Sequence, residues 1–308
     1  MMSDASPSLS VNPKETSSGQ TAGIVALQCL ILCVLIGFVF NSSILSMVYK
    51  WRTDGNWSHG WLVPVFSLYF LGIHRQQLKA AVCKPNYAGA LVIAAGLSLY
   101  YGSLAWGYTY PQLFAIIPCM LGLVLLIWGN QIFRVAWFPI CYLVFAMPLP
   151  RSTFFNLTLP LREFASQVSG WALGLLPEVY TSVQGVVIEY ERGTVERGSL
   201  NVEEACSGMR LMMAFCSLGV AMAYLGDRPL WQRIIMIISC IPIAVFCNMI
   251  RVLVTGVVHV YGREDLAQGT AHGLLGLAML PIALGLFALV GYVLSNLVVE
   301  VEEEPQAE

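Results

Sequence analysis

The chain has 308 residues and a formal net charge of −2, with 57% hydrophobic residues and only 11% charged residues. Its mean hydropathy is +0.70, whereas an ordinary soluble domain carries about 25% charged residues. This composition excludes a soluble globular enzyme and a disordered chain, and the near-neutral charge excludes a nucleic-acid binder. It predicts instead an all-α polytopic membrane protein that has the lipid bilayer as a partner.

Polar tails flank one long apolar domain. Residues 1–21 are rich in Ser, Thr and Pro and are expected to form a disordered cytoplasmic tail, and the acidic residues 300–308 are expected to form a second tail. The apolar stretch that follows the first tail is too long for a signal-peptide core, so we expect it to remain as the first span. Residues 22–299 then form a single transmembrane domain.

Apolar stretches of about 20 residues between charges predict about eight transmembrane helices. The uncharged stretch between Lys84 and Arg134 is long enough for two of them, with Gly107–Pro111 as the turn that separates the pair. The expected ranges are 22–45, 58–73, two spans within 85–133, 132–147, 206–225, 234–258 and 271–299.

The outer segment 148–205 interrupts this pattern. Residues 154–176 mix apolar and polar side chains at helical spacing and predict an amphipathic helix at the membrane interface, with a full crossing as the alternative. Residues 177–205 carry β-favouring side chains, among them Val183, Val187 and Tyr190. A second run, 195–202, follows after Glu191, Arg192 and Gly193, and the two runs predict a small pair of strands.

Basic residues predict the orientation, because cytoplasmic loops are richer in Lys and Arg. These residues gather in 75–84, at Arg134 and in 228–233. With those loops inside, both termini are cytoplasmic, provided that residues 154–176 do not cross. The outward segments are then 50–60, 105–112, 148–205 and 259–271.

We expect Cys206, Arg251 and His272 to lie near one depth at the outer face of the membrane. Residues of these types are unusual or energetically costly within a membrane. Cys206 begins one inward span and His272 opens another. Arg251 lies about seven residues before the end of an outward span, which is about 10 Å below the surface. Each also has a simpler interpretation, because a cysteine can be packing, an arginine can reach the interface and a histidine can cap a helix.

Together the three residue types suit acyl transfer. A thiolate attacks a carbonyl carbon, an imidazole carries the proton to the departing amine, and a guanidinium stabilises the oxyanion. Cys206 stands at an expected helix start, where the dipole favours a thiolate, and Arg210 adds positive charge one turn later. We expect no cofactor and no metal, because the chain has no P-loop, no GxGxxG, no HExxH and no Cys/His metal spacing.

Several short motifs follow one another in a fixed order. They are E-A-C-S-G-M-R at Glu204–Arg210, N-M-I-R at Asn248–Arg251, H-G at His272, N-W-S-H-G-W-L-V-P at Asn56–Pro64 and P-L-R at Pro160–Arg162. The set resembles the exosortase/archaeosortase family over about residues 50–280. Met209 stands where many relatives have Leu, which is a volume-conserving change.

This resemblance implies an eight-span cysteine peptidase and transpeptidase of a bacterial inner membrane, with its active site facing the periplasm. Its partners would be exported proteins with a PEP-CTERM-like signal: a Pro-Glu-Pro motif, a transmembrane helix and a basic cluster. Such enzymes often accompany exopolysaccharide synthesis. Cys206 would be the nucleophile, with Arg251 and His272 completing the catalytic set. The supporting or substrate-binding residues would be Glu204, Ser207, Arg210, Asn248 and His59, the last of which also fits a satisfied interfacial histidine.

Two other functions fit the same residues. A non-enzymatic transporter, or an accessory subunit of exopolysaccharide export, would line a polar path with Arg251, His272 and His59. Transporters often contain related halves, and this chain shows no internal repeat. An intramembrane hydrolase would use water in place of an amine acceptor. The mass of the new C-terminus separates hydrolysis from transfer, and an acyl adduct trapped on Cys206 would dismiss the transporter.

Overall fold

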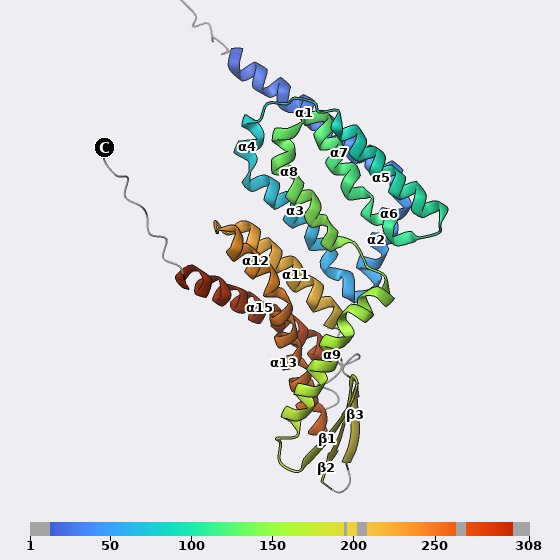
Figure 1. Ribbon diagram of the computed structural model, residues 1–308, viewed down its shortest axis with the longest axis vertical. Coiled ribbons are helices and arrows are strands. Elements are labelled where there is room, and N and C mark those ends of the chain that lie inside the picture. Colours follow the sequence, from blue (N-terminus) through green and yellow to red (C-terminus); the bar gives the residue numbers. More distant parts are fainter. Residues whose placement is uncertain (1–12, 194–195, 202–207, 263–268, 298–308) are drawn as a thin grey trace, which may run out of the picture.

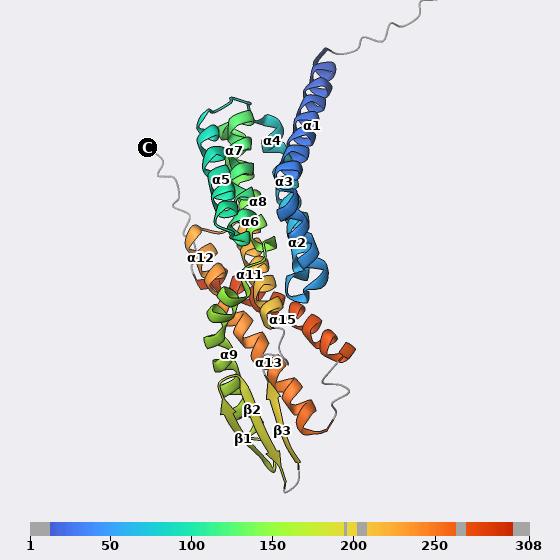
Figure 2. The same ribbon diagram turned by 90° about the vertical axis from the view of Figure 1, so that its right-hand side faces the viewer.

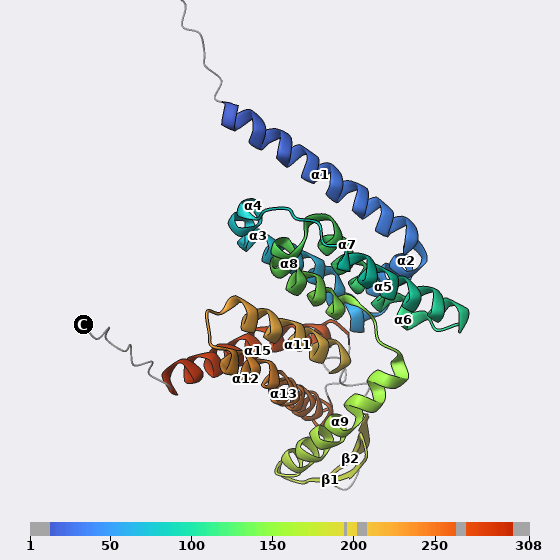
Figure 3. The same ribbon diagram turned by 45° about the horizontal axis from the view of Figure 1, so that its top comes forward.

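A computed structural model describes residues 13–193, 196–201, 208–262 and 269–297. Within these ranges helices dominate, and they are joined by one small antiparallel sheet. Figure 3 separates two parts, the helices of residues 13–146 and the helices and strands of residues 151–297. The predicted acidic tail 300–308 lies outside the described residues.

The first part opens with two helices that meet at a sharp bend. Helices α1 (Pro13–Val39) and α2 (Asn41–Thr53) are bent by 85° at the break between them. The predicted first span, 22–45, therefore does not continue as one straight helix. Helix α1 also begins inside the expected disordered tail 1–21, because residues 13–21 already form its first turns.

Three short elements come next: the 3-10 helix η1 (Gly55–Trp61), α3 (Leu62–Ile73) and α4 (Arg75–Ala80). Two long apolar stretches of helix follow. The first is α5 (Ala88–Ala105), and the second consists of α6 (Thr109–Phe114) and α7 (Ile116–Trp128). The predicted turn, Gly107–Pro111, is confirmed in its first two residues only, because α6 already begins at Thr109. Gly107 has a φ of 71° there, a left-handed value that glycine adopts without a steric penalty.

The two parts of the molecule join along α8 (Asn130–Tyr142) and η2 (Leu143–Ala146). At the end of α8, the buried Tyr142 donates a hydrogen bond to the carbonyl of Ser217 over 3.1 Å. Trp57 and Ala221 belong to the same buried cluster, which therefore links the N-terminal helices to the C-terminal ones.

Helix α9 (Arg151–Leu173) confirms a helix in the region predicted at 154–176, but its polar face points inward. Its buried polar residues are Thr158, Arg162, Ser166 and Ser169. Phe164 and Trp171, on another face, are 53% and 69% exposed. The helix therefore buries its polar stripe against neighbouring elements and presents aromatic side chains outward.

The strands form a three-stranded sheet in the order β1-β2-β3, one strand more than the predicted pair. The strands are β1 (Val179–Gln184), β2 (Val187–Arg192) and β3 (Glu196–Asn201), and both pairings are antiparallel. Leu173, Ile188, Leu200 and Val252 make one buried cluster, which packs the sheet against α9 and α13 (Cys240–Val260). Figures 1 and 2 show the sheet at one end of the molecule.

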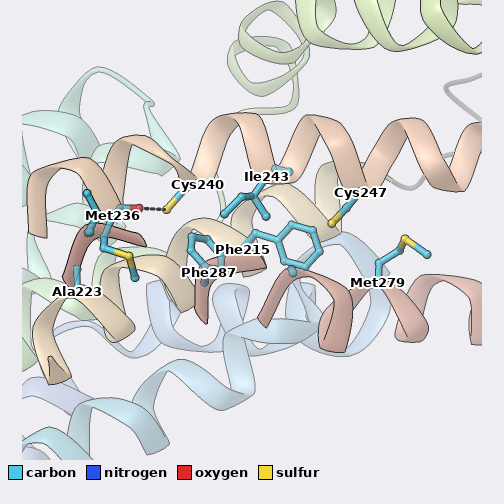
Figure 4. Packing of buried hydrophobic residues seen from close by; sticks show 11 residues of the cluster. Phe215, Ala223, Met236, Cys240, Ile243, Cys247, Met279 and Phe287 are labelled. Carbon is cyan, nitrogen blue, oxygen red and sulfur yellow. Dashed lines mark hydrogen bonds between the residues drawn. The ribbon is translucent and has the colours of Figure 1, made fainter. Parts of the chain in front are cut away.

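The C-terminal helices pack around a core of large apolar side chains. They are α11 (Gly208–Leu225), α12 (Leu230–Ile238), α13 and α15 (Gly269–Leu297). Figure 4 shows Phe215 of α11 and Phe287 of α15 meeting Ile243 of α13 in this core. The three helices are thereby held in a fixed relation to one another.

Among the described residues, four helices are long and apolar enough to cross a membrane, or five if α1 and α2 form one bent span. The four are Ala88–Ala105, Thr109–Trp128, Leu230–Val260 and Leu274–Leu297. The predicted spans 132–147 and 206–225 correspond to shorter apolar helices, Asn130–Ala146 and Met212–Leu225. A helical protein with several candidate membrane spans is therefore confirmed, and the count of eight spans stays a prediction.

Candidate active site

Arg251 is the largest of the fully buried side chains in the described residues, with an exposure of 2%. It lies on α13, and its guanidinium faces α15 at Gly276, where an added Cβ would lie 3.6 Å from Cζ. An arginine in a span costs about 2.5–3.5 kcal/mol on insertion scales, and such residues usually have a function. Arg251 is therefore not an arginine that reaches the interface with its head in water.

The packing of α13 against α15 relates Arg251 to His272. In Figure 4, Cys240 lies near Phe287, and Cys247 lies near Met279 further along both helices, so the two helices run antiparallel. His272 precedes Gly276 by four residues on α15, which is about one turn and the same helix face. The backbone at His272 therefore lies about one turn from the contact between Arg251 and Gly276. The side chain of His272 falls outside what the structure describes.

The start of α11 lies near the same depth. A Cβ at Gly219 would meet the sulfur of Cys240, which fixes one point of contact between α11 and α13. Met212 and Asn248 line one cavity further along, so these helices are also antiparallel. Eleven residues separate Gly208 from Gly219, and eleven separate Cys240 from Arg251. Helix α11 therefore begins close to the level of Arg251.

Several of the candidate residues lie in or next to the segment before α11. Glu204, Cys206 and Ser207 lie outside the described residues, so their contacts stay predictions. Arg210 lies in the first turn of α11, and only its helix position is described. The segment that contains these residues is followed by α11, which begins at Gly208.

Asn248 lies one turn before Arg251 on α13 and lines a cavity. The cavity measures about 30 Å³ and is lined by Thr158, Leu161 and Arg162 of α9, Met212 of α11, and Ala244, Val245 and Asn248 of α13. The Oδ1 atom of Asn248 is buried and has no hydrogen-bond partner among the described residues. Arg162 is 5% exposed, so a buried arginine lines this cavity, while Arg251 is not among the lining residues.

His59 has a well-defined structural setting in the N-terminal part. Its side chain is 9% exposed, and its Nε2 lies 3.2 Å from the carbonyl oxygen of Phe145 in η2. The indole of Trp51 donates to the neighbouring carbonyl of Ala146 over 2.8 Å, and Gly60 packs against that indole. These contacts anchor η1 on η2, and the role of His59 stays a prediction. No described contact brings His59 to Arg251.

Arg162 is the polar residue that our selection of site residues from the sequence missed. It was noted among the polar residues of the helix predicted at 154–176 and as part of the P-L-R motif, but not as a site residue. The available signal was its spacing, because Thr158, Arg162, Ser166 and Ser169 recur at intervals of three or four residues on one face of a helix. Among the described residues, no group of three or more His, Cys, Asp or Glu side chains could hold a metal ion.

Comparison with known proteins adds one finding. The family model described as transmembrane exosortase matches residues 51–289. The matched region runs from the end of α2 into α15 and contains all of the candidate residues named above. No curated protein and no solved structure matches the chain.

Proposed function

This chain belongs to the transmembrane exosortase family, and on that premise we propose that it is a membrane cysteine transpeptidase. It cleaves the C-terminal sorting signal of exported proteins and transfers the new acyl end to an acceptor. The substrate signal is PEP-CTERM-like, with a short motif, a transmembrane helix and a basic cluster. The support for this specific reaction is the family together with the position of Arg251.

In the proposed reaction, the Cys206 thiolate attacks the scissile carbonyl carbon and forms a tetrahedral intermediate. The guanidinium of Arg251 stabilises the oxyanion in a site of low dielectric constant. As the intermediate collapses, the C–N bond breaks and His272 donates a proton to the departing amine. A thioester remains on Cys206. The acceptor nucleophile then gives its proton to His272 and displaces the sulfur.

One observation carries the proposal: Arg251 is 2% exposed, and its guanidinium lies against Gly276, one turn from His272 on α15. The start of α11, two residues after Cys206, lies near the same depth. These backbone positions support the proposal that a thiolate, an imidazole and a guanidinium act on one peptide bond. In the proposed topology, the enzyme lies in the inner membrane with both termini in the cytoplasm and its active site facing the periplasm.

The first prediction concerns the nucleophile. A reporter that ends in a Pro-Glu-Pro motif, a hydrophobic helix and a basic cluster is co-expressed with the enzyme in a bacterial host. The wild type is expected to remove the tail, and Cys206→Ala is expected to abolish removal, because no other group forms the thioester. Immunoblotting follows the tail, and mass spectrometry reads the new C-terminus. An added group indicates transfer, whereas a free carboxylate indicates that water is the acceptor.

A matched control is Cys83→Ala, because Cys83 is an exposed free cysteine in a loop. It should leave processing unchanged, while Cys206→Ala accumulates in the membrane to the wild-type amount. Processing at the wild-type rate by Cys206→Ala would show that the thiol is not the nucleophile. Intact reporter in the presence of the wild type would contradict the proposed substrate signal.

A further inference from the structure

The cavity beside Arg251 combines a polar lining with an apolar wall. Arg162 contributes a guanidinium from α9, and Asn248 contributes an amide from α13, while the side chains of Leu161, Met212 and Val245 complete much of the remaining wall. Asn248 precedes Arg251 by three residues, which corresponds to about 4.5 Å along the helix axis. The cavity therefore adjoins the place where the proposed chemistry occurs.

The two polar side chains offer complementary hydrogen-bonding groups. The buried Oδ1 of Asn248 has no hydrogen-bond partner among the described residues, and a buried acceptor without a partner costs about 1–3 kcal/mol. The guanidinium of Arg162 carries five N–H donors in a fixed plane, so it can serve an acceptor in the cavity beside its other interactions. A ligand that suits both groups has one N–H donor and one carbonyl acceptor.

A peptide group has this combination of donor and acceptor. We propose that Arg162 and Asn248 form a backbone clamp for the substrate, in which Asn248 Oδ1 accepts from a substrate N–H and Arg162 donates to a substrate carbonyl. This inference rests on the proposed function and deepens it by assigning a subsite. The clamp binds main chain, so it holds the peptide beside the scissile bond without selecting a side chain.

The cavity size agrees with this assignment. About 30 Å³ exceeds the 10–15 Å³ that one water needs, but it is small for a large side chain. A single main-chain group, entering from a peptide that lies across the opening, leaves the apolar wall in contact with the peptide's carbon atoms. An ordered water could also bond to Asn248, so the test must separate the peptide from water.

The test uses synthetic peptides that span the motif and scissile bond of the reporter signal, with the purified full-length enzyme in detergent. One peptide is all-amide. In the others, each amide near the scissile bond is replaced in turn by an ester, which removes the N–H donor and keeps the carbonyl. With the wild type, one ester position is expected to raise KM about five- to tenfold, the range for loss of one hydrogen bond.

The variant Asn248→Ala is expected to raise KM for the all-amide peptide by a similar factor. Replacing the amide at the sensitive position by an ester should then not raise the KM of this variant any further. If Asn248 had only a structural role, the ester would still raise the KM of Asn248→Ala. Arg162→Lys keeps the charge and loses the planar fork, so it should also raise KM more than it lowers kcat. Ser43→Ala is the matched control, because Ser43 Oγ is likewise buried without a described partner but lies on α2.

The results separate the clamp from the enzyme's proposed activity. Two outcomes contradict the clamp, provided that the wild type processes the all-amide peptide. In the first, Asn248→Ala has the same KM for this peptide as the wild type. In the second, each ester raises the KM of Asn248→Ala as much as it raises that of the wild type, so the cavity holds water. If the wild type processes no peptide and no reporter, the proposed function fails and the clamp fails with it.

Discussion

Among single residues, Gly276 has the clearest effect on the candidate site. A Cβ added there would lie 3.6 Å from Cζ and Nη2 of Arg251, which is ordinary van der Waals contact. Alanine therefore fits at this position, whereas a longer side chain would occupy the volume of the guanidinium. The glycine leaves room for the charged group on the face of α15 that also carries His272.

We therefore expect Gly276→Ala to retain most of the reporter cleavage and Gly276→Leu to lose about a hundredfold, because a shift of about 1 Å can cost that much in rate. Gly285→Leu is the control on the same helix, since a Cβ there meets nothing within 4 Å. Cleavage rates are normalised to the amount of enzyme in the membrane. Wild-type turnover by Gly276→Leu would contradict the placement of Arg251 beside α15.

At the scale of elements, α9 shows how a membrane changes the meaning of a helical pattern. The spacing of its residues predicted a helix but could not tell which face packs inward. In this fold the polar face is the buried one, and Ser166 donates to the carbonyl of Gly185 over 2.7 Å. Ser169 donates to the carbonyl of Met249 over 3.5 Å. Buried hydroxyls find backbone partners, and the outward aromatic residues Phe164 and Trp171 suit an apolar environment.

A second element-scale feature is the close approach of α5 and α7. A Cβ at Gly89 would lie 2.5 Å from the carbonyl oxygen of Gly122 and 2.5 Å from the backbone nitrogen of Leu126. Because these atoms belong to the backbone, they cannot rotate away as a side chain would. Small residues at helix contacts are the usual means of close packing within membranes.

Gly89→Ala should therefore separate α5 from α7 and destabilise the protein by about 1–3 kcal/mol, the usual range for overpacking. The measurement is thermal unfolding of the purified protein in detergent. Gly102→Ala on the same helix is the matched control, since a Cβ there meets nothing within 4 Å. Equal melting temperatures for the two variants would show that α5 and α7 are less tightly packed than the structure indicates.

The sequence predicted those elements whose signal is local. The turn at Gly107, the helix near 154–176 and the β-favouring run after it were read from residue type and spacing. The bend of 85° between α1 and α2 was missed, although Asn41, Ser42 and Ser43 interrupt the apolar stretch there. The run 195–202 was predicted as a strand and contains β3, whereas β1, Val179–Gln184, was missed as a separate strand. The tight turn at Gly185, with a φ of 59°, divides the first run into β1 and β2, and the prediction did not recognise it.

The candidate site was predictable only in part, for a similar reason. Arg251 stood out because a charge in an apolar helix is costly wherever the helix packs. The cavity that Arg162 shares with Asn248 depends on the contact between α9 and α13, more than eighty residues apart. No local pattern reports such a contact. The depth argument placed Arg251 and His272 together, and the packing of α13 on α15 supports that placement at the level of the backbone.

For the whole molecule, the arrangement concentrates the candidate site at one end of the C-terminal helices. The sheet, the end of α13 and α9 lie together in Figures 1 and 2. Arg192 of β2 donates to the carbonyl of Val260 over 3.2 Å and ties the sheet to the end of α13. The sheet thus supports the helix that carries Arg251, and the segment with Cys206 connects β3 to α11.

The most direct test of this account measures whether positions 206 and 272 are neighbours. In a chain that keeps Cys206, carries His272→Cys and has its other cysteines replaced, a short thiol-specific cross-linker is applied in native membranes. The control chain keeps only Cys247 and carries Met279→Cys, a pair within the core of Figure 4. Mass spectrometry of the digested peptides should find both links. A control that links fully while 206 and 272 stay unlinked would contradict a shared active site.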